Sequence, residues 1–169
     1  LLGQSERRRP FYGVIADGIH LHPTSIKIAY NAHPDGLILV TDAMRLCGLP
    51  DGVYEWTNGE RIVKTGARLT LEGSDKIAGS SATLIECVNN FRRWSGASTA
   101  AAINAVTAAP ARLLGLEGVK GSLESGADAD LIVLGENEDP FTGPALTVDQ
   151  VWKLGAKIHD TDKAAALAV

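Results

Sequence analysis

The 169-residue sequence contains few cysteines and no long apolar run. Its two cysteines, Cys47 and Cys87, are too few for a disulfide framework or a cysteine-rich zinc cluster. Every apolar run is shorter than the roughly 18 residues of a membrane-spanning helix. The apolar part of the first residues is also too short for a signal peptide. We therefore expect a cytoplasmic protein with no membrane partner.

The sequence also lacks a large excess of charge of either sign. It has 16 basic and 20 acidic residues and a net charge of −4, which argues against nucleic acid as the main partner. Hydrophobic residues make up 45% of the sequence, so we expect a packed core rather than disorder. Position 1 is a leucine and the only methionine is Met44, so we expect the chain to be part of a longer protein.

Two short apolar runs each end in polar residues of kinds that enzymes use. Residues 14–16 are followed by Asp17 and His20, and residues 37–40 are followed by Thr41 and Asp42. A continuous apolar run is typical of a strand buried on both faces of a parallel sheet. Carboxylates just past such strands lie where α/β barrels carry their active sites. Asp42 and His20 are therefore the first candidate functional residues.

The segment between these runs has helical spacing. Pro23 suits the first turn of a helix, and Ile26, Ala29 and Tyr30 then share one face before residues 33–36 end it. This strand–helix–strand order predicts two parallel strands joined by a right-handed crossover.

A β-rich insertion follows. Short β segments are expected at 53–57, 61–65 and 68–72, and Asn58-Gly59 between the first two favours a hairpin because both residues tolerate positive φ. We expect residues 52–75 to form a hairpin insertion after a barrel strand.

Helices and then a second β region are predicted for the rest of the chain. Residues 83–96 carry capping-box spacing, a glycine stop and one apolar face, formed by Leu84, Cys87, Val88 and Phe91. A second helix is expected from Ser98 or Thr99, with Ala102, Ile103 and Val106 buried, and a third from Pro110 to Gly115. Strands are expected at 131–134 and within 148–160, with a turn at Gly155, followed by a frayed helix or tail at 161–169.

Several of these segments together resemble the C-terminal half of the N-acetylglucosamine-6-phosphate deacetylase family, within the amidohydrolase superfamily. The motifs that carry the resemblance are IADGIH (15–20), LVTDA (39–43), LPDG (49–52), AGSS (78–81) and PARLLGL with KGSLESGADADLIVL (110–116 and 120–134). The last pair is common to many amidohydrolases, whereas the first two at this spacing are more specific to the deacetylases.

The resemblance implies an α/β fold: the C-terminal part of a (β/α)8 TIM-like barrel plus strands of a small β-sandwich. We expect residues 1–117 to belong to the barrel, 118–160 to the sandwich and 161–169 to a tail. The family precedent is a homodimer that acts on a small amino-sugar phosphate.

The resemblance also implies a reaction, the metal-dependent hydrolysis of the acetamide of N-acetylglucosamine 6-phosphate. Asp42 would take a proton from the attacking water and pass it to the departing amine. His20 would bind substrate and help to stabilise the oxyanion. Further substrate contacts are expected from Asp17, Gly18 and Ile19, and from Ala78, Gly79 and Ser80 in a loop before a helix.

The metal ligands of the family, a Glu and two His residues, have no matching positions in this sequence, and neither has its main phosphate-binding arginine. The expected cofactor is a divalent ion, zinc or similar, held by residues outside this chain. The AGSS motif has Ala78 where some members carry serine, which removes a hydroxyl but keeps the backbone donors.

Simpler interpretations exist for single residues. Asp42 could cap the following helix, and His22 could be a loop residue instead of half of a His-x-His metal site with His20. Asp128 and Asp130 suit a turn before a strand. The arginines at 7–9 suit a solvated basic run better than a phosphate site.

Three functions remain open at this point. The chain could belong to the deacetylase described above. It could belong to another amidohydrolase, such as a deaminase or a cyclic amidase, although the IADG-x-H motif argues against this. It could also be a short protein that binds a sugar phosphate or a partner without catalysis.

Overall fold

The computed structural model describes residues 9–140 and 142–161, which divide into two compact units between Ala102 and Ile103. Each unit is considered by itself. Within the described residues, no helix is long and apolar enough to span a membrane. The fold is mixed α/β, and the described strands form no closed barrel.

The first unit begins with a parallel strand pair. Strands β1 (Tyr12–Ile15) and β2 (Leu37–Val40) pair in register from Tyr12 opposite Leu37 to Ile15 opposite Val40. Helix α1 (Pro23–Ala32) and the 3-10 turn η2 (Pro34–Gly36) connect them. The predicted strand–helix–strand unit with parallel strands is therefore confirmed.

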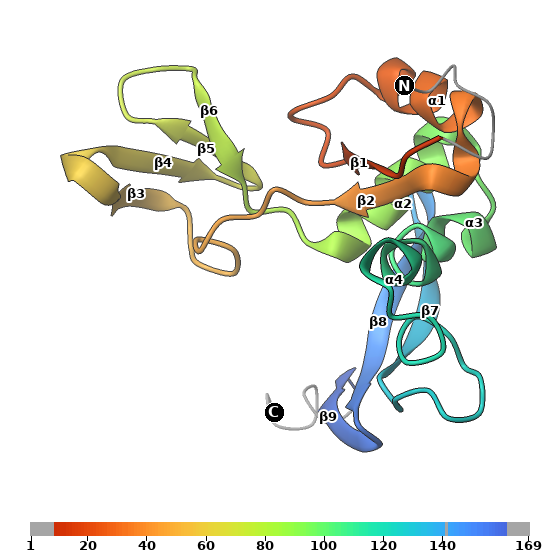
Figure 1. The fold of residues 1–169 in the computed structure, drawn as a ribbon. Coiled ribbons are helices and arrows are strands. Elements are labelled where there is room, and N and C mark those ends of the chain that lie inside the picture. The colour runs from red at the N-terminus through yellow and green to blue at the C-terminus, as the bar shows by residue number, and fades with distance from the viewer. Residues whose placement is uncertain (1–8, 141, 162–169) are drawn as a thin grey trace. The chain divides into compact units, whose positions relative to one another are not determined.

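Helix α2 (Leu84–Ser95) packs beside α1 and β2, as Figure 1 shows. The Tyr30 ring of α1 meets the Phe91 ring of α2 edge-on, with centroids 5.1 Å apart. The expected capping box of Thr83 and Glu86 and the left-handed stop at Gly96 are both present. Of the four predicted apolar-face residues, Leu84 is the exception, since it is exposed at the first turn.

A four-stranded antiparallel sheet is inserted between β2 and α2. It runs β3 (Gly52–Glu55), β4 (Arg61–Thr65), β5 (Arg68–Leu71) and β6 (Ile77–Ser80) in chain order (Figure 1). The turn η3 (Thr57–Gly59) has positive φ at Asn58 and Gly59, as predicted. The insertion is longer than the expected 52–75, because β6 adds a fourth strand that the sequence analysis missed.

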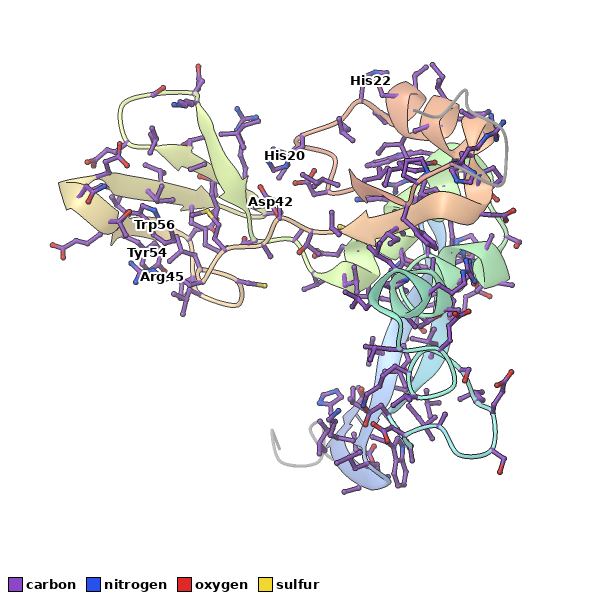
Figure 2. All side chains as sticks on the ribbon, in the orientation of Figure 1. His20, His22, Asp42, Arg45, Tyr54 and Trp56 are labelled. Atoms are coloured by element: carbon purple, nitrogen blue, oxygen red, sulfur yellow. The ribbon has the colours of Figure 1, made fainter. Side chains whose placement is uncertain are left out.

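This sheet has a small apolar core of its own. Leu46, Ile62 and Leu69 are buried in it, and Met44 and Trp56 pack against them with other side chains. The guanidinium of Arg45 lies 4.5 Å from the centre of the Trp56 ring, and Figure 2 shows both residues on this sheet.

After α2 come α3 (Thr99–Asn104) and α4 (Ala108–Leu114). Both helices were predicted, although α4 begins before Pro110. In α3 the expected burial holds for Ala102, while Ile103 is only half-buried. Helix α4 ends at Gly115 in the left-handed conformation, as expected.

The second unit also contains a three-stranded antiparallel sheet, β7 (Leu131–Asp139), β8 (Gly143–Lys153) and β9 (Ala156–Asp160). Its turn at Leu154 and Gly155 has positive φ at both residues. Asp130 supports this turn, because its carboxylate accepts the Leu154 amide at 2.9 Å and pairs with Lys120 and Lys153. Asp130 therefore supports the turn between β8 and β9, whereas the sequence analysis assigned it to the turn before a strand. The tail predicted after Thr161 lies outside the described residues.

Candidate active site

The register of β1 and β2 brings two polar segments to one edge. Ile15 is opposite Val40, so Asp17 and Asp42, each two residues further on, leave the pair at the same end. In parallel sheets this carboxyl end is where α/β enzymes assemble their sites. The sequence expectation that Asp42 and the Asp17–His20 segment belong together therefore has a structural basis.

The segment after β1 folds into a tight loop around Asp17. One carboxylate oxygen, Oδ1, accepts the amides of Ile19 at 2.9 Å and His20 at 3.0 Å. Gly18 has φ +79°, and a Cβ there would lie 3.2 Å from the ring of Trp94 in α2. Asn90 of α2 also donates to the Ala16 carbonyl at 3.0 Å, so two residues of α2 contact this segment.

His20 lies between two carboxylates. Its Nδ1 is 2.7 Å from Asp17 Oδ2, and its Nε2 is 3.3 Å from Asp42 Oδ2. The exposed fraction of the side chains rises along this chain of contacts, from 0% at Asp17 to 20% at His20 and 54% at Asp42. Asp42 is therefore the most exposed of the three side chains, and Figure 2 shows it close to His20.

Asp42 has an unusual backbone. Its φ is +52°, the left-handed region that residues other than glycine seldom adopt. Such conformations persist where the surroundings enforce them, and they are concentrated at functional sites. The alternative reading of Asp42 as the cap of a following helix is not supported, because the next regular element is β3.

The conformation of Asp42 is held by β6. The Ser80 amide donates to the Asp42 carbonyl at 3.0 Å, and the Met44 amide donates to the Ser80 carbonyl at 2.9 Å. The Ser80 hydroxyl donates to the Thr41 carbonyl at 2.7 Å, and Ser80 is fully buried. These three bonds link the inserted sheet to the end of β2.

The expectation of a loop at 78–80 with free amides before a helix is wrong. These residues are part of strand β6, and both the amide and the hydroxyl of Ser80 are occupied. Gly79 has φ +137°, and a Cβ there would lie 2.5 Å from Met44 Sδ. Substrate binding by Ala78, Gly79 and Ser80 stays a prediction, but the contacts show that Gly79 and Ser80 support Asp42.

His22 lies apart from this pair. Its Nδ1 accepts the Thr24 amide at 3.2 Å and so caps α1, and Figure 2 shows it near the start of that helix. Across residues 9–140 and 142–161, no three His, Cys, Asp or Glu side chains form a metal-binding group. The donors in this part of the chain therefore do not fit the divalent ion that the resemblance implies.

Cys87 of α2 lies in the core behind the site. Burial, together with the nearby Asp17 charge, raises the pKa of its thiol to about 11. The sequence analysis placed this thiol in the core, and it is fully buried.

A model of the amidohydrolase family matches residues 5–158, which is most of the chain. The chain belongs to the amidohydrolase family. Among members of this family, it is 47% identical over 149 residues to the N-acetylglucosamine-6-phosphate deacetylase of Danio rerio, covering 86% of this chain but 36% of that protein.

A shorter amidohydrolase relative has nearly the length of this chain. It is a putative N-acetylgalactosamine-6-phosphate deacetylase of Escherichia coli K12, 33% identical over 148 residues, and the match covers 88% of this chain and 83% of that protein. The chain thus spans about a third of the first deacetylase and most of the second.

Solved amidohydrolase structures share the fold. The deacetylase of Thermotoga maritima matches with a TM-score of 0.74 at 26% identity, covering 89% of this chain and 39% of that one. A mutant deacetylase of Mycobacterium smegmatis, solved in complex with N-acetyl-D-glucosamine-6-phosphate, matches with a TM-score of 0.71 at 30% identity, covering 87% of this chain and 37% of that one.

Sequence reasoning missed Asn90, and it assigned Gly79 and Ser80 to substrate contacts instead of to support of the site. Asn90, Ser80 and Gly79 hold the two polar segments, but only a glycine flanked by strand-like residues could have indicated a close backbone approach at 79. The hydrogen bonds between β6 and the end of β2 join residues that are far apart in the sequence, so no local sequence pattern predicts them.

Proposed function

We propose that the whole protein hydrolyses the acetamide of N-acetylglucosamine 6-phosphate to acetate and glucosamine 6-phosphate. The observation that carries this proposal is the pairing of an exposed Asp42 with His20 at 3.3 Å, at the carboxyl end of parallel strands in an amidohydrolase. The similarity to several deacetylases of this substrate class supports it.

The two side chains suit the two proton transfers of amide hydrolysis. As the water oxygen bonds to the acetyl carbon, one water proton passes to a carboxylate oxygen of Asp42. The carbon–nitrogen bond then breaks while Asp42 returns this proton to the nitrogen, because an amine leaves poorly unless it is protonated. A proton on His20 Nε2 would donate to the carbonyl oxygen as its negative charge grows.

Other features of the whole protein belong to the same proposal. Strands β1 and β2 would be neighbours in a (β/α)8 barrel whose C-terminal portion is residues 1–117, and residues 118–160 would contribute to a small β-sandwich. The divalent ion would need ligands outside the described residues, so we assign no step to it. We expect the whole protein to be a cytoplasmic homodimer.

The test is release of acetate from N-acetylglucosamine 6-phosphate by the whole protein, with Asp42→Asn as the variant. We expect a loss of about 100- to 10,000-fold in kcat, the usual contribution of a general acid–base group. Asp75→Asn is the matched control, because Asp75 is exposed in the β5–β6 turn and its carbonyl oxygen makes its one described hydrogen bond.

The galactosamine epimer should be assayed in parallel, because a relative of nearly the same length is named for it. If only the galactosamine epimer is hydrolysed, the substrate would be N-acetylgalactosamine 6-phosphate, and the proposed roles of Asp42 and His20 in amide hydrolysis would be unchanged. Full activity in Asp42→Asn would refute the role of Asp42, and hydrolysis of neither epimer would refute the proposed reaction.

A further inference from the structure

The Asp17 carboxylate is enclosed by its own loop. Its side chain has no exposed surface, Oδ1 accepts two backbone amides, and Oδ2 lies 2.7 Å from His20 Nδ1. A buried carboxylate is stable only where hydrogen bonds replace its lost hydration. Both carboxylate oxygens of Asp17 therefore contact groups of its own loop, and neither is free to bind a substrate.

The contact between Asp17 Oδ2 and His20 Nδ1 determines which ring nitrogen of His20 carries the proton. Carboxylate oxygens accept hydrogen bonds, and the 2.7 Å contact of Nδ1 with Asp17 Oδ2 is much shorter than the 3.3 Å contact of Nε2 with Asp42 Oδ2, so a single ring proton is favoured on Nδ1. The proton on Nδ1 also fixes the ring orientation, which leaves Nε2 as the atom that faces Asp42. The two ring nitrogens thus have separate tasks.

We propose that Asp17 is a positioning residue that holds His20 with its proton on Nδ1 and presents Nε2 to Asp42 and the reacting group. The inference rests on the proposed function for its catalytic consequence, and it replaces the substrate contact expected of Asp17. When Nε2 donates to the carbonyl oxygen, His20 carries both protons, and its positive charge lies between two carboxylates.

A turn-forming role alone would not use both oxygens in this way. Oδ1 by itself closes the turn onto the amides of Ile19 and His20, whereas Oδ2 is occupied by the imidazole. The substitution Asp17→Asn separates the two roles. Its carbonyl oxygen can still accept the amides, but its NH2 group then faces Nδ1 and requires an acceptor there.

Asp17→Asn should therefore move the His20 proton from Nδ1 to Nε2, and the shape of the side chain hardly changes. A comparable exchange in serine protease triads acts through the wrong tautomer. The variant ring can still donate from Nε2, but only as a neutral imidazole, because the NH2 group introduced by Asp17→Asn disfavours a second proton on Nδ1. We therefore expect kcat to fall by roughly 10- to 100-fold, as for other residues that orient a functional histidine, with little change in KM.

The direct measurement is two-bond proton–nitrogen correlation NMR of the whole protein with labelled histidine. The protein has four histidines, and His20→Gln identifies the signal of His20 by its loss. At a pH where the ring is neutral, the wild type should carry the proton on Nδ1 and Asp17→Asn on Nε2. The control Asp75→Asn should match the wild type in both spectrum and kcat.

Two results would overturn the inference: a neutral wild-type ring with its proton on Nε2, or a tautomer change in Asp17→Asn with wild-type kcat. If Asp17→Asn does not fold, the wild-type spectrum still decides the proton position. The spectrum does not depend on turnover, so a protein that fails to deacetylate can keep the Nδ1 proton. In that case the proposed function fails while the positioning of His20 stands.

Discussion

Gly79→Ala should weaken the junction between β6 and the end of β2. At φ +137° the backbone of this residue is in a region that side chains rarely adopt, and the new Cβ would lie 2.5 Å from Met44 Sδ and 2.7 Å from Met44 Cγ. The strained backbone costs about 1–3 kcal/mol, and the overpacking about 1–3 kcal/mol more. Met44 packs against the core of the inserted sheet, so it cannot move aside freely.

Hydrogen exchange at the Ser80 and Met44 amides reports this loss directly, because both amides bond across the junction. A loss of about 3 kcal/mol in the free energy of opening would accelerate exchange roughly 100-fold. Gly73→Ala is the matched control. Gly73 lies in the turn between β5 and β6 with φ +73°, and a Cβ there would meet nothing within 4 Å, so only the backbone term of about 1–2 kcal/mol applies.

A second variant isolates the contact with Met44. In a Met44→Ala background, Gly79→Ala should lose only its backbone term, so the two substitutions should show a favourable coupling of about 1–3 kcal/mol. Equal exchange rates in Gly79→Ala and Gly73→Ala would refute the reasoning. Strict additivity of the Met44 and Gly79 substitutions would show that Met44 is not the obstacle.

Three further predictions concern the rest of the chain. Cys47 is exposed and should react with a thiol reagent at pH 8, whereas Cys87, buried and with its pKa raised to about 11, should react only on unfolding; labelling followed by peptide mass analysis checks this, and equal rates would contradict it. Burial raises the pKa of Tyr12 from 10.0 to about 12, so the folded state binds more protons in that window and stability should fall as pH rises through it. Urea unfolding should show a shallower fall in Tyr12→Phe, and an unchanged slope would argue against the shift. Pairing with Lys120 and Lys153 holds the Asp130 pKa well below its usual range, so Asp130→Asn should lower the melting temperature modestly, less so in high salt. A salt-independent loss would point to the Leu154 hydrogen bond instead.

Local sequence signals predicted the helices and turns well where one residue type, or the spacing of apolar residues, determines where an element begins or ends. The capping box at Thr83, the stop at Gly96 and the turn at Asn58-Gly59 depend on backbone chemistry within a few residues. The parallel pairing of β1 and β2 followed from the strand–helix–strand order.

The candidate site was only partly accessible from sequence. Its side chains at Asp42 and His20 were found because each follows an apolar strand, but their 3.3 Å contact depends on strand register. Strand β6 was missed because Ile77–Ser80 is short and rich in small residues, so its β character comes from its partners rather than its own preferences. Leu84 was expected to be buried because its spacing fits the apolar face of the helix. It is exposed, because it is the first residue of α2 and does not pack against the core.

The bonds between Ser80 and the Thr41–Met44 segment make the inserted sheet a brace for the exposed carboxylate. Insertions in barrel loops are commonly treated as exchangeable modules that adapt a conserved framework to new ligands. This insertion does not have that freedom. A designer who shortened or replaced it would release the strained backbone of Asp42, so any transplant of this strand end into a barrel enzyme must carry β6 with it.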